Sequence, residues 1–170
     1  MRTRQKGPGA PEPQEPWNEV VPGLWMGGHY WTDATGTDHP VVVERQFDLV
    51  ISLYTRPGHG PAPGVEHLVA EIPDGPLDAG QLRTVQDLAA VAVRALGEGR
   101  TVLVRCHAGF NRSGLVVAQV LIGQGRDAVR AVGAVRAVRS GRALSNPVFE
   151  DYLGTGLDVA RLLSELEAPA

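Results

Sequence analysis

Cysteine and lysine are nearly absent from this sequence of 170 residues, with Cys106 as the only cysteine and Lys6 as the only lysine. A single thiol cannot form a disulfide within the chain, which predicts a reducing compartment and a cytoplasmic protein. The N-terminal residues carry charge and proline without the apolar stretch of a secretory signal. No apolar run approaches the roughly 20 residues that a membrane-spanning helix needs. We therefore expect no membrane partner.

The sequence also lacks a strong excess of either charge. Its formal net charge is −3, which disfavours binding of nucleic acid through overall positive charge. Basic residues do gather in one region, where we expect a solvated helix face rather than a docking surface. They are Arg126, Arg130, Arg136, Arg139 and Arg142.

The length suits one hydrophobic core rather than two. Residues 1–16 are polar and rich in proline, which is typical of a disordered tail. The composition changes at Trp17, so residues 17–170 are expected to form a single domain. No internal repeat interrupts it.

Hydrophobic periodicity predicts strands interleaved with helices. Apolar runs at 47–53 and 101–105 are typical of buried strands, residues 65–72 alternate like a third, and a short strand is expected within 19–28. Helices are expected at 78–97, at 113–125, after Asp127, from Asn146 and near the C-terminus, with Asp78, Asp127 and Asn146 as N-caps. This order predicts an α/β fold, with a mostly parallel central sheet flanked by helices.

The lone thiol lies in the stretch VLVRCHAGFNRSG, residues 102–114, between a buried strand and a helix. Such a turn directs backbone N–H groups and the helix N-terminus into one concavity, which suits a phosphate group. A lone buried cysteine usually fills a core. Here donors and positive charge would favour its thiolate, which indicates a nucleophile that attacks phosphorus.

The neighbours of Cys106 have predicted roles in that chemistry. Arg112 would grip two phosphate oxygens and stabilise the charge that builds on them. Ser113 would hydrogen-bond the sulfur and ease its departure when water hydrolyses the intermediate. Gly109 lets the backbone bend toward the ligand. The residues expected to bind the substrate phosphate are His107, Ala108, Gly109, Phe110, Asn111 and Arg112, with His107 acting mainly through its backbone N–H.

Cys-x5-Arg-Ser between a buried strand and a helix resembles the signature of the cysteine-dependent protein phosphatases, and the element order resembles their dual-specificity branch. VPGLWMGG resembles the opening strand of that family, FDLVISL its central strand, and SNPVFEDYL its Asn-x-x-Phe helix. The resemblance covers most of residues 19–153. It implies a protein tyrosine phosphatase-like fold and hydrolysis of phosphomonoesters through a cysteinyl-phosphate intermediate. The implied substrate is phosphotyrosine, extending to phosphoserine and phosphothreonine of proteins, with no metal or organic cofactor.

That family also uses an aspartate on a mobile loop, one helix upstream of the cysteine, as general acid and then base. The segment IPDGPLD fits, because Asp74 precedes Cys106 by 32 residues and is flanked by Pro73 and Gly75. Asp78 is the rival, but it suits the N-cap of the following helix better. We therefore expect Asp74 to carry the proton.

Arg105 departs from the family pattern, which has histidine directly before the nucleophile. We expect Arg105 to hydrogen-bond loop carbonyls and to keep positive charge near the thiolate. The remaining histidines have no spacing that indicates a function: His29, His39, His59 and His67.

Two other functions stay open. AGFNRSG also resembles the loop of RNA 5′-triphosphatases in the same superfamily, so a hydrolase of RNA or nucleotide 5′-phosphates is one alternative. A phosphoinositide substrate is disfavoured, because the loop lacks the lysines of phosphatases that act on it. The second alternative, of another class, is a non-catalytic module that binds phosphorylated partners.

Overall fold

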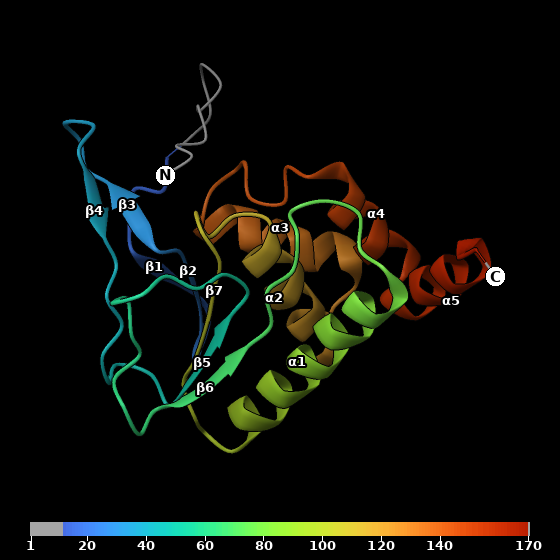
Figure 1. The fold of residues 1–170 in the computed structure, drawn as a ribbon, viewed down its shortest axis with the longest axis horizontal. Helices are drawn as coiled ribbons and strands as arrows, with labels where there is room; N and C mark the ends of the chain where they lie inside the picture. The colour runs from blue at the N-terminus through green and yellow to red at the C-terminus, as the bar shows by residue number, and fades with distance from the viewer. Residues whose placement is uncertain (1–11, 170) are drawn as a thin grey trace.

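Five strands form the central sheet of the computed structural model, which describes residues 12–169 (Figure 1). Their order across the sheet is β1 (Trp17–Val21), β2 (Leu24–Gly27), β7 (Val102–Arg105), β5 (Leu49–Ser52) and β6 (Glu66–Val69). β1 is antiparallel to β2, and every other neighbouring pair is parallel. The predicted mostly parallel sheet is confirmed.

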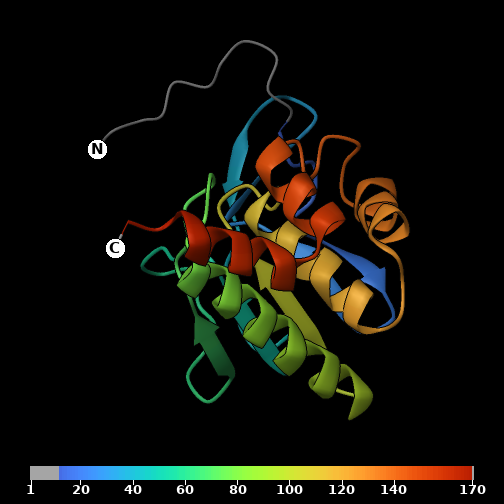
Figure 2. The same cartoon turned by 90° about the vertical axis from the view of Figure 1, so that its right-hand side faces the viewer.

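The helices all lie on one face of this sheet, as Figures 1 and 2 show from two directions. They are α1 (Ala79–Gly97), α2 (Arg112–Gly123), α3 (Ala128–Val138), α4 (Pro147–Thr155) and α5 (Leu157–Glu167). The side chains of Asp78, Asp127 and Asn146 accept N–H hydrogen bonds from the first turns of α1, α3 and α4, as the sequence predicts. Within residues 12–169, no helix combines the length and apolar character needed to cross a bilayer.

Both faces of the sheet are covered at its centre. Ile51 and Val104 belong to the large core between the sheet and the helices, whereas Val50 and Leu103 pack with Val43 and Phe47 on the other side. Successive residues of a strand point to opposite faces, so burial on both sides requires unbroken apolar runs. This explains why β5 and β7 were recognisable from the sequence.

A short hairpin of β3 (Tyr30–Thr32) and β4 (Asp38–Pro40) was not predicted. The expected disordered tail, residues 1–16, lies mostly outside the described residues. Residues 1–11 lie outside the described part of the chain, but residues 12–16 are fixed by hydrogen bonds to the sheet and the hairpin. The carbonyl of Pro13 accepts from Thr32 N at 2.6 Å, and that of Pro16 from Gly28 N at 3.4 Å.

Four parallel strands end at the same edge of the sheet, and the connections there carry the predicted site. β7 leads into Cys106, β2 into Gly28, β5 into Tyr54, and β6 into the segment that holds Asp74. Open α/β sheets bind their ligands at the carboxyl ends of their strands. The topology thus brings together residues that lie up to about 80 positions apart.

Candidate active site

Cys106 begins the loop between β7 and α2, and its side chain is buried, with 3% of its surface exposed. Ser113, in the first turn of α2, is fully buried beside it, and the distance between Cys106 Sγ and Ser113 Oγ is 3.3 Å. Asn111 is the N-cap residue of α2, and its side chain makes no capping hydrogen bond there. The N-terminus of α2 and the thiol therefore meet at the base of one loop.

The loop, residues 106–111, rests directly on the end of β2. Gly109 has φ of +79°, and a Cβ atom there would lie 2.5 Å from the carbonyl carbon and oxygen of Gly27. A Cβ atom on Gly28 would lie 2.7 Å from the backbone of His107 and Ala108. The loop can keep this path only because both contact positions are glycine.

Arg139 is hydrogen-bonded to the cysteine loop, whereas the sequence predicted that it would lie on a solvated helix face. Its guanidinium donates to the carbonyl oxygens of Ala108 and Gly109, both at 3.1 Å. It also donates to Glu15 O at 2.8 Å and to Asn18 Oδ1 at 2.9 Å. Burial lowers the pKa of Arg139 to about 10, so it keeps its charge at neutral pH. One arginine thus joins the loop to the N-terminal segment.

Arg136 also differs from the prediction, because its guanidinium is engaged with other chain segments. It donates to the carbonyls of Ala143 and Leu144 at 3.0 and 2.9 Å and forms an ion pair with Glu150 at 3.1 Å. The backbone N–H of Leu144 in turn donates to Phe110 O at 3.1 Å. The segment after α3 is therefore fastened to the rim of the loop. Arg126, Arg130 and Arg142 are exposed as predicted.

Asp74 lies across the loop and is held by two amide side chains. Asn111 Nδ2 donates to one carboxylate oxygen at 3.2 Å, and Asn146 Nδ2 donates to the other at 2.9 Å. Asn111 Oδ1 accepts from Asn146 N at 3.1 Å, which closes the cluster. Asp78 instead forms a capping box with Gln81 at the start of α1. The two carboxylates thus occupy different settings, with only Asp74 bonded to the cysteine loop.

Arg112 lies between the Asp74 segment and an aromatic side chain. Its Nη1 donates a long hydrogen bond of 3.4 Å to Ile72 O, and its guanidinium carbon lies 5.6 Å from the ring centroid of Tyr54. The ring of His107 contacts two tyrosine rings, with centroid distances of 5.0 Å to Tyr54 and 5.1 Å to Tyr30. These rings form an aromatic wall beside the loop, which the sequence did not indicate.

Solved structures with this architecture are reported as phosphatases or phosphatase-like proteins. Human DUSP28 matches with a TM-score of 0.69 and 24% identity, over 89% of this chain and 99% of its own. OH1 from the Orf virus, a tyrosine phosphatase, matches with a TM-score of 0.62 and 18% identity, over 88% and 90%. A human tyrosine phosphatase-like serine/threonine/tyrosine-interacting protein matches with 0.56 and 18%, over 86% and 96%. No protein-family model and no curated protein sequence matches the chain.

The chain has the fold of the dual-specificity cysteine phosphatases. Within this phosphatase fold, Arg105 points away from the cysteine loop. It follows Leu103 on the face covered by residues 41–65, and it is 1% exposed. Its guanidinium donates to Ser52 Oγ at 2.9 Å, His59 O at 2.9 Å and Gly60 O at 2.6 Å. The expected hydrogen bonds from Arg105 to the cysteine loop are therefore wrong, because its guanidinium binds Ser52 and the 59–60 turn instead.

His29 contacts the backbone of Cys106 in this phosphatase fold. Its Nδ1 lies 2.8 Å from the carbonyl oxygen of Cys106, and its backbone N–H donates to His107 O at 2.7 Å. Because a carbonyl only accepts, Nδ1 carries the proton. Burial lowers the pKa of His29 to about 4, so its imidazole is neutral near pH 7. Sequence spacing gave no sign of this role, which depends on the adjacency of β2 and β7.

Proposed function

We propose that this protein is a phosphatase that hydrolyses phosphomonoesters through a cysteinyl-phosphate intermediate. The proposal rests on the cysteine loop, which connects the thiol of Cys106 to the carboxylate of Asp74. The thiol of Cys106 lies at the loop's base against Ser113 at 3.3 Å, and Asp74 is hydrogen-bonded to the rim through Asn111 at 3.2 Å. A nucleophile and an acid at opposite ends of one anion-binding loop suit in-line phosphoryl transfer.

In the proposed first step, the Cys106 thiolate attacks phosphorus while backbone N–H groups of the loop and Arg112 bind the non-bridging oxygens. The bond from phosphorus to the ester oxygen breaks, and Asp74 gives its proton to that leaving oxygen. In the second step, water attacks phosphorus and Asp74 takes a proton from it. The phosphorus–sulfur bond breaks, and Ser113 hydrogen-bonds the departing thiolate.

Hydrolysis of a small aryl phosphate by the purified chain tests the reaction. We expect turnover that vanadate inhibits and that Cys106→Ser abolishes without loss of folding. Because the scheme uses only side chains, backbone N–H groups and water, a metal chelator should leave the rate unchanged. A folded chain that binds a phosphopeptide but shows no turnover from roughly pH 5 to 8 would instead support the non-catalytic module.

The general acid is tested by comparing Asp74→Asn with Asp78→Asn. We expect Asp74→Asn to lower kcat about 100-fold or more on phenyl phosphate, because loss of a general acid typically costs that much. The defect should shrink on nitrophenyl phosphate, whose leaving oxygen needs no proton. Asp78→Asn is the matched control, since asparagine also caps helices. If Asp78→Asn is the damaging change, the assignment of Asp74 is wrong.

We propose phosphotyrosine as the main substrate, extending to phosphoserine and phosphothreonine, in a cytoplasmic setting that keeps the lone thiol reduced. The wall of Tyr30, Tyr54 and His107 supports this choice, because an aryl ester can pack on aromatic rings. Release of phosphate should be compared between a phosphotyrosyl peptide, a phosphothreonyl peptide and a triphosphorylated RNA end. Preference for the RNA end would favour the alternative hydrolase.

A further inference from the structure

The carboxylate of Asp74 is held by two amide side chains that lie on different elements. Asn111 ends the cysteine loop, and Asn146 caps α4. Each amide oxygen already accepts from a backbone N–H, that of Asn111 from Asn146 N and that of Asn146 from Val148 N, both at 3.1 Å. Each amide must therefore turn its Nδ2 toward Asp74, and an amide nitrogen only donates. This Asn111–Asn146 clamp presents donors to Asp74.

Such a clamp fits an ionised carboxylate. Asn111 Nδ2 donates to Asp74 Oδ2 at 3.2 Å and Asn146 Nδ2 donates to Asp74 Oδ1 at 2.9 Å, so both carboxylate oxygens accept. A protonated carboxyl group would instead carry an O–H on one oxygen. That O–H would face an N–H donor, and one of the two hydrogen bonds would be lost. In the proposed reaction, Asp74 is ionised at the start of the second step, when it takes a proton from water.

The segment that carries Asp74 is also fixed on either side of the carboxylate. Arg112 donates to Ile72 O at 3.4 Å, and the hydroxyl of Tyr152 on α4 accepts from Leu77 N at 2.9 Å. Hydrogen bonds at three positions within six residues restrict this segment to one path beside the cysteine loop. The Asp74 carboxylate is therefore placed before any substrate is present.

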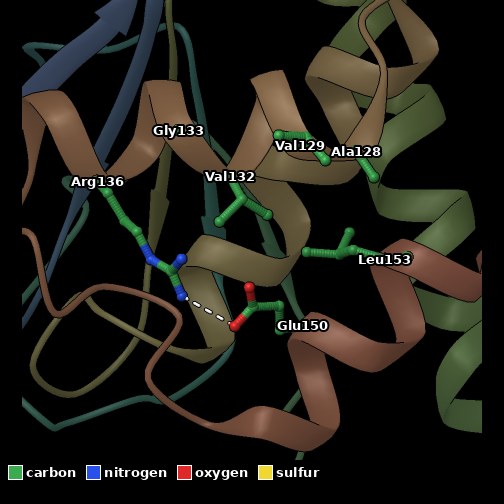
Figure 3. Close-up of a pocket in the computed structure, with 8 residues that line it drawn as sticks. Ala128, Val129, Val132, Gly133, Arg136, Glu150 and Leu153 are labelled. Atoms are coloured by element: carbon green, nitrogen blue, oxygen red, sulfur yellow. Dashed lines mark hydrogen bonds and ion pairs between the residues drawn. The ribbon is translucent and has the colours of Figure 1, made fainter.

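Helix α4 is in turn fastened to α3, which fixes the position of Asn146. Figure 3 shows the side chain of Arg136 reaching from α3 to Glu150 on α4, with which it forms an ion pair at 3.1 Å. The same guanidinium binds the carbonyls of Ala143 and Leu144, just before the N-cap of α4. Groups that act in catalysis need supports of this kind, because a shift of about 1 Å can cost roughly 100-fold in rate.

We propose that Asn111 is a positioning residue, which together with Asn146 holds the Asp74 carboxylate for the second step. In that step water attacks phosphorus, one water proton passes to Asp74, and the phosphorus–sulfur bond breaks with its electron pair left on sulfur. The inference rests on the proposed function, because it assigns the two amides a part in that reaction. It separates the side chain of Asn111 from phosphate binding, which the proposed mechanism gives to backbone N–H groups and Arg112.

Asn111→Ala tests the clamp, because the Asn111 side chain makes no capping bond to α2 and its loss leaves that helix start unchanged. On nitrophenyl phosphate, whose leaving oxygen needs no proton, we expect kcat to fall about tenfold or more. The ratio kcat/KM should stay within about twofold of the wild type, because it reports only the steps up to the cysteinyl phosphate. Rapid mixing should show a burst close to one nitrophenol per chain, followed by the slow second step.

Two further variants separate positioning from a structural role. Asn146→Ser should reproduce the burst, because serine still caps α4 but lacks the amide donor. Ser145→Ala is the matched control and should behave as the wild type, because Ser145 Oγ donates to Asn111 Oδ1 at 3.4 Å, at the end of the amide away from Asp74. In the Asp74→Asn background, Asn111→Ala should cost nothing further, because the amide acts only through Asp74.

The inference and the proposed function fail in different ways. Weaker inhibition by inorganic phosphate and a lower kcat/KM in Asn111→Ala would show that this side chain binds the substrate phosphate, which overturns the inference. A further loss in the Asp74→Asn background would also overturn it, as would an Asn111→Ala chain with wild-type kcat and no burst. A wild type without turnover overturns the proposed function, and the inference falls with it.

Discussion

Replacing Arg139 by methionine removes the guanidinium that supports the cysteine loop. Four hydrogen bonds are lost, to the carbonyls of Ala108, Gly109 and Glu15 and to the amide of Asn18. A charged donor is worth up to about 3 kcal/mol per bond when fully buried, but Arg139 is only half-buried and water replaces part of each contact. At a net value near 0.5–1 kcal/mol per bond, the variant loses about 2–4 kcal/mol of unfolding free energy.

Thermal unfolding measures this loss. For a chain of 170 residues, a loss of that size lowers Tm by roughly 4–16 °C. Arg130→Met, on the helix that Arg139 caps, is the matched control, because its side chain is exposed and its ion pair with Asp127 is 3.7 Å long. That variant should lie within about 0.5 kcal/mol of the wild type. If both variants unfold within about 2 °C of each other, Arg139 does not support the loop as argued.

Two further predictions concern one residue of the loop and one residue that contacts it. Gly109→Ala forces a Cβ atom to within 2.5 Å of the Gly27 backbone at a φ of +79°, so phosphatase turnover should be lost. Gly36→Ala is the control, because Gly36 also has a positive φ but open space around it. Equal turnover of the two variants would contradict the loop geometry. The pKa of His29 is lowered from 6.5 to about 4, so its contribution to stability is complete above pH 6.5 and is lost as the pH falls toward 4. The urea concentration at the unfolding midpoint should therefore fall as the pH is lowered from 6.5 to 4, and it should fall less steeply in His29→Asn than in the wild type. If the midpoint depends on pH equally in both proteins, the pKa of His29 is not lowered in the folded state.

Local chemistry made the helices and the central strands predictable. Asp78, Asp127 and Asn146 each act as the cap that the sequence indicated, because capping depends only on residues within one turn. The hairpin of β3 and β4 was missed because its strands have only three residues each, too few to show an alternating pattern. Such short pairs are fixed by tertiary contacts, including the bond from Thr32 N to Pro13 O.

The residues of the candidate site also fall into those that the sequence predicts and those that it does not. The positions of Cys106, Ser113 and Gly109 follow from one strand–turn–helix, so thirteen consecutive residues contain their geometry. Arg139 and His29 reach the loop from other parts of the chain, and sequence spacing holds no trace of that approach. Arg139 is one of five arginines in residues 126–142. Their spacing along the sequence does not show which of them contacts the cysteine loop.

The four hydrogen bonds of Arg139 connect the cysteine loop to Glu15 and Asn18 near the N-terminus. The same guanidinium that holds the carbonyls of Ala108 and Gly109 also takes the carbonyl of Glu15, more than 90 residues away in sequence. A chain cut to begin at Trp17 would lose this anchor of the loop and also the bond from Thr32 N to Pro13 O in the hairpin. The supports of the cysteine loop therefore extend ahead of the first strand, to Glu15.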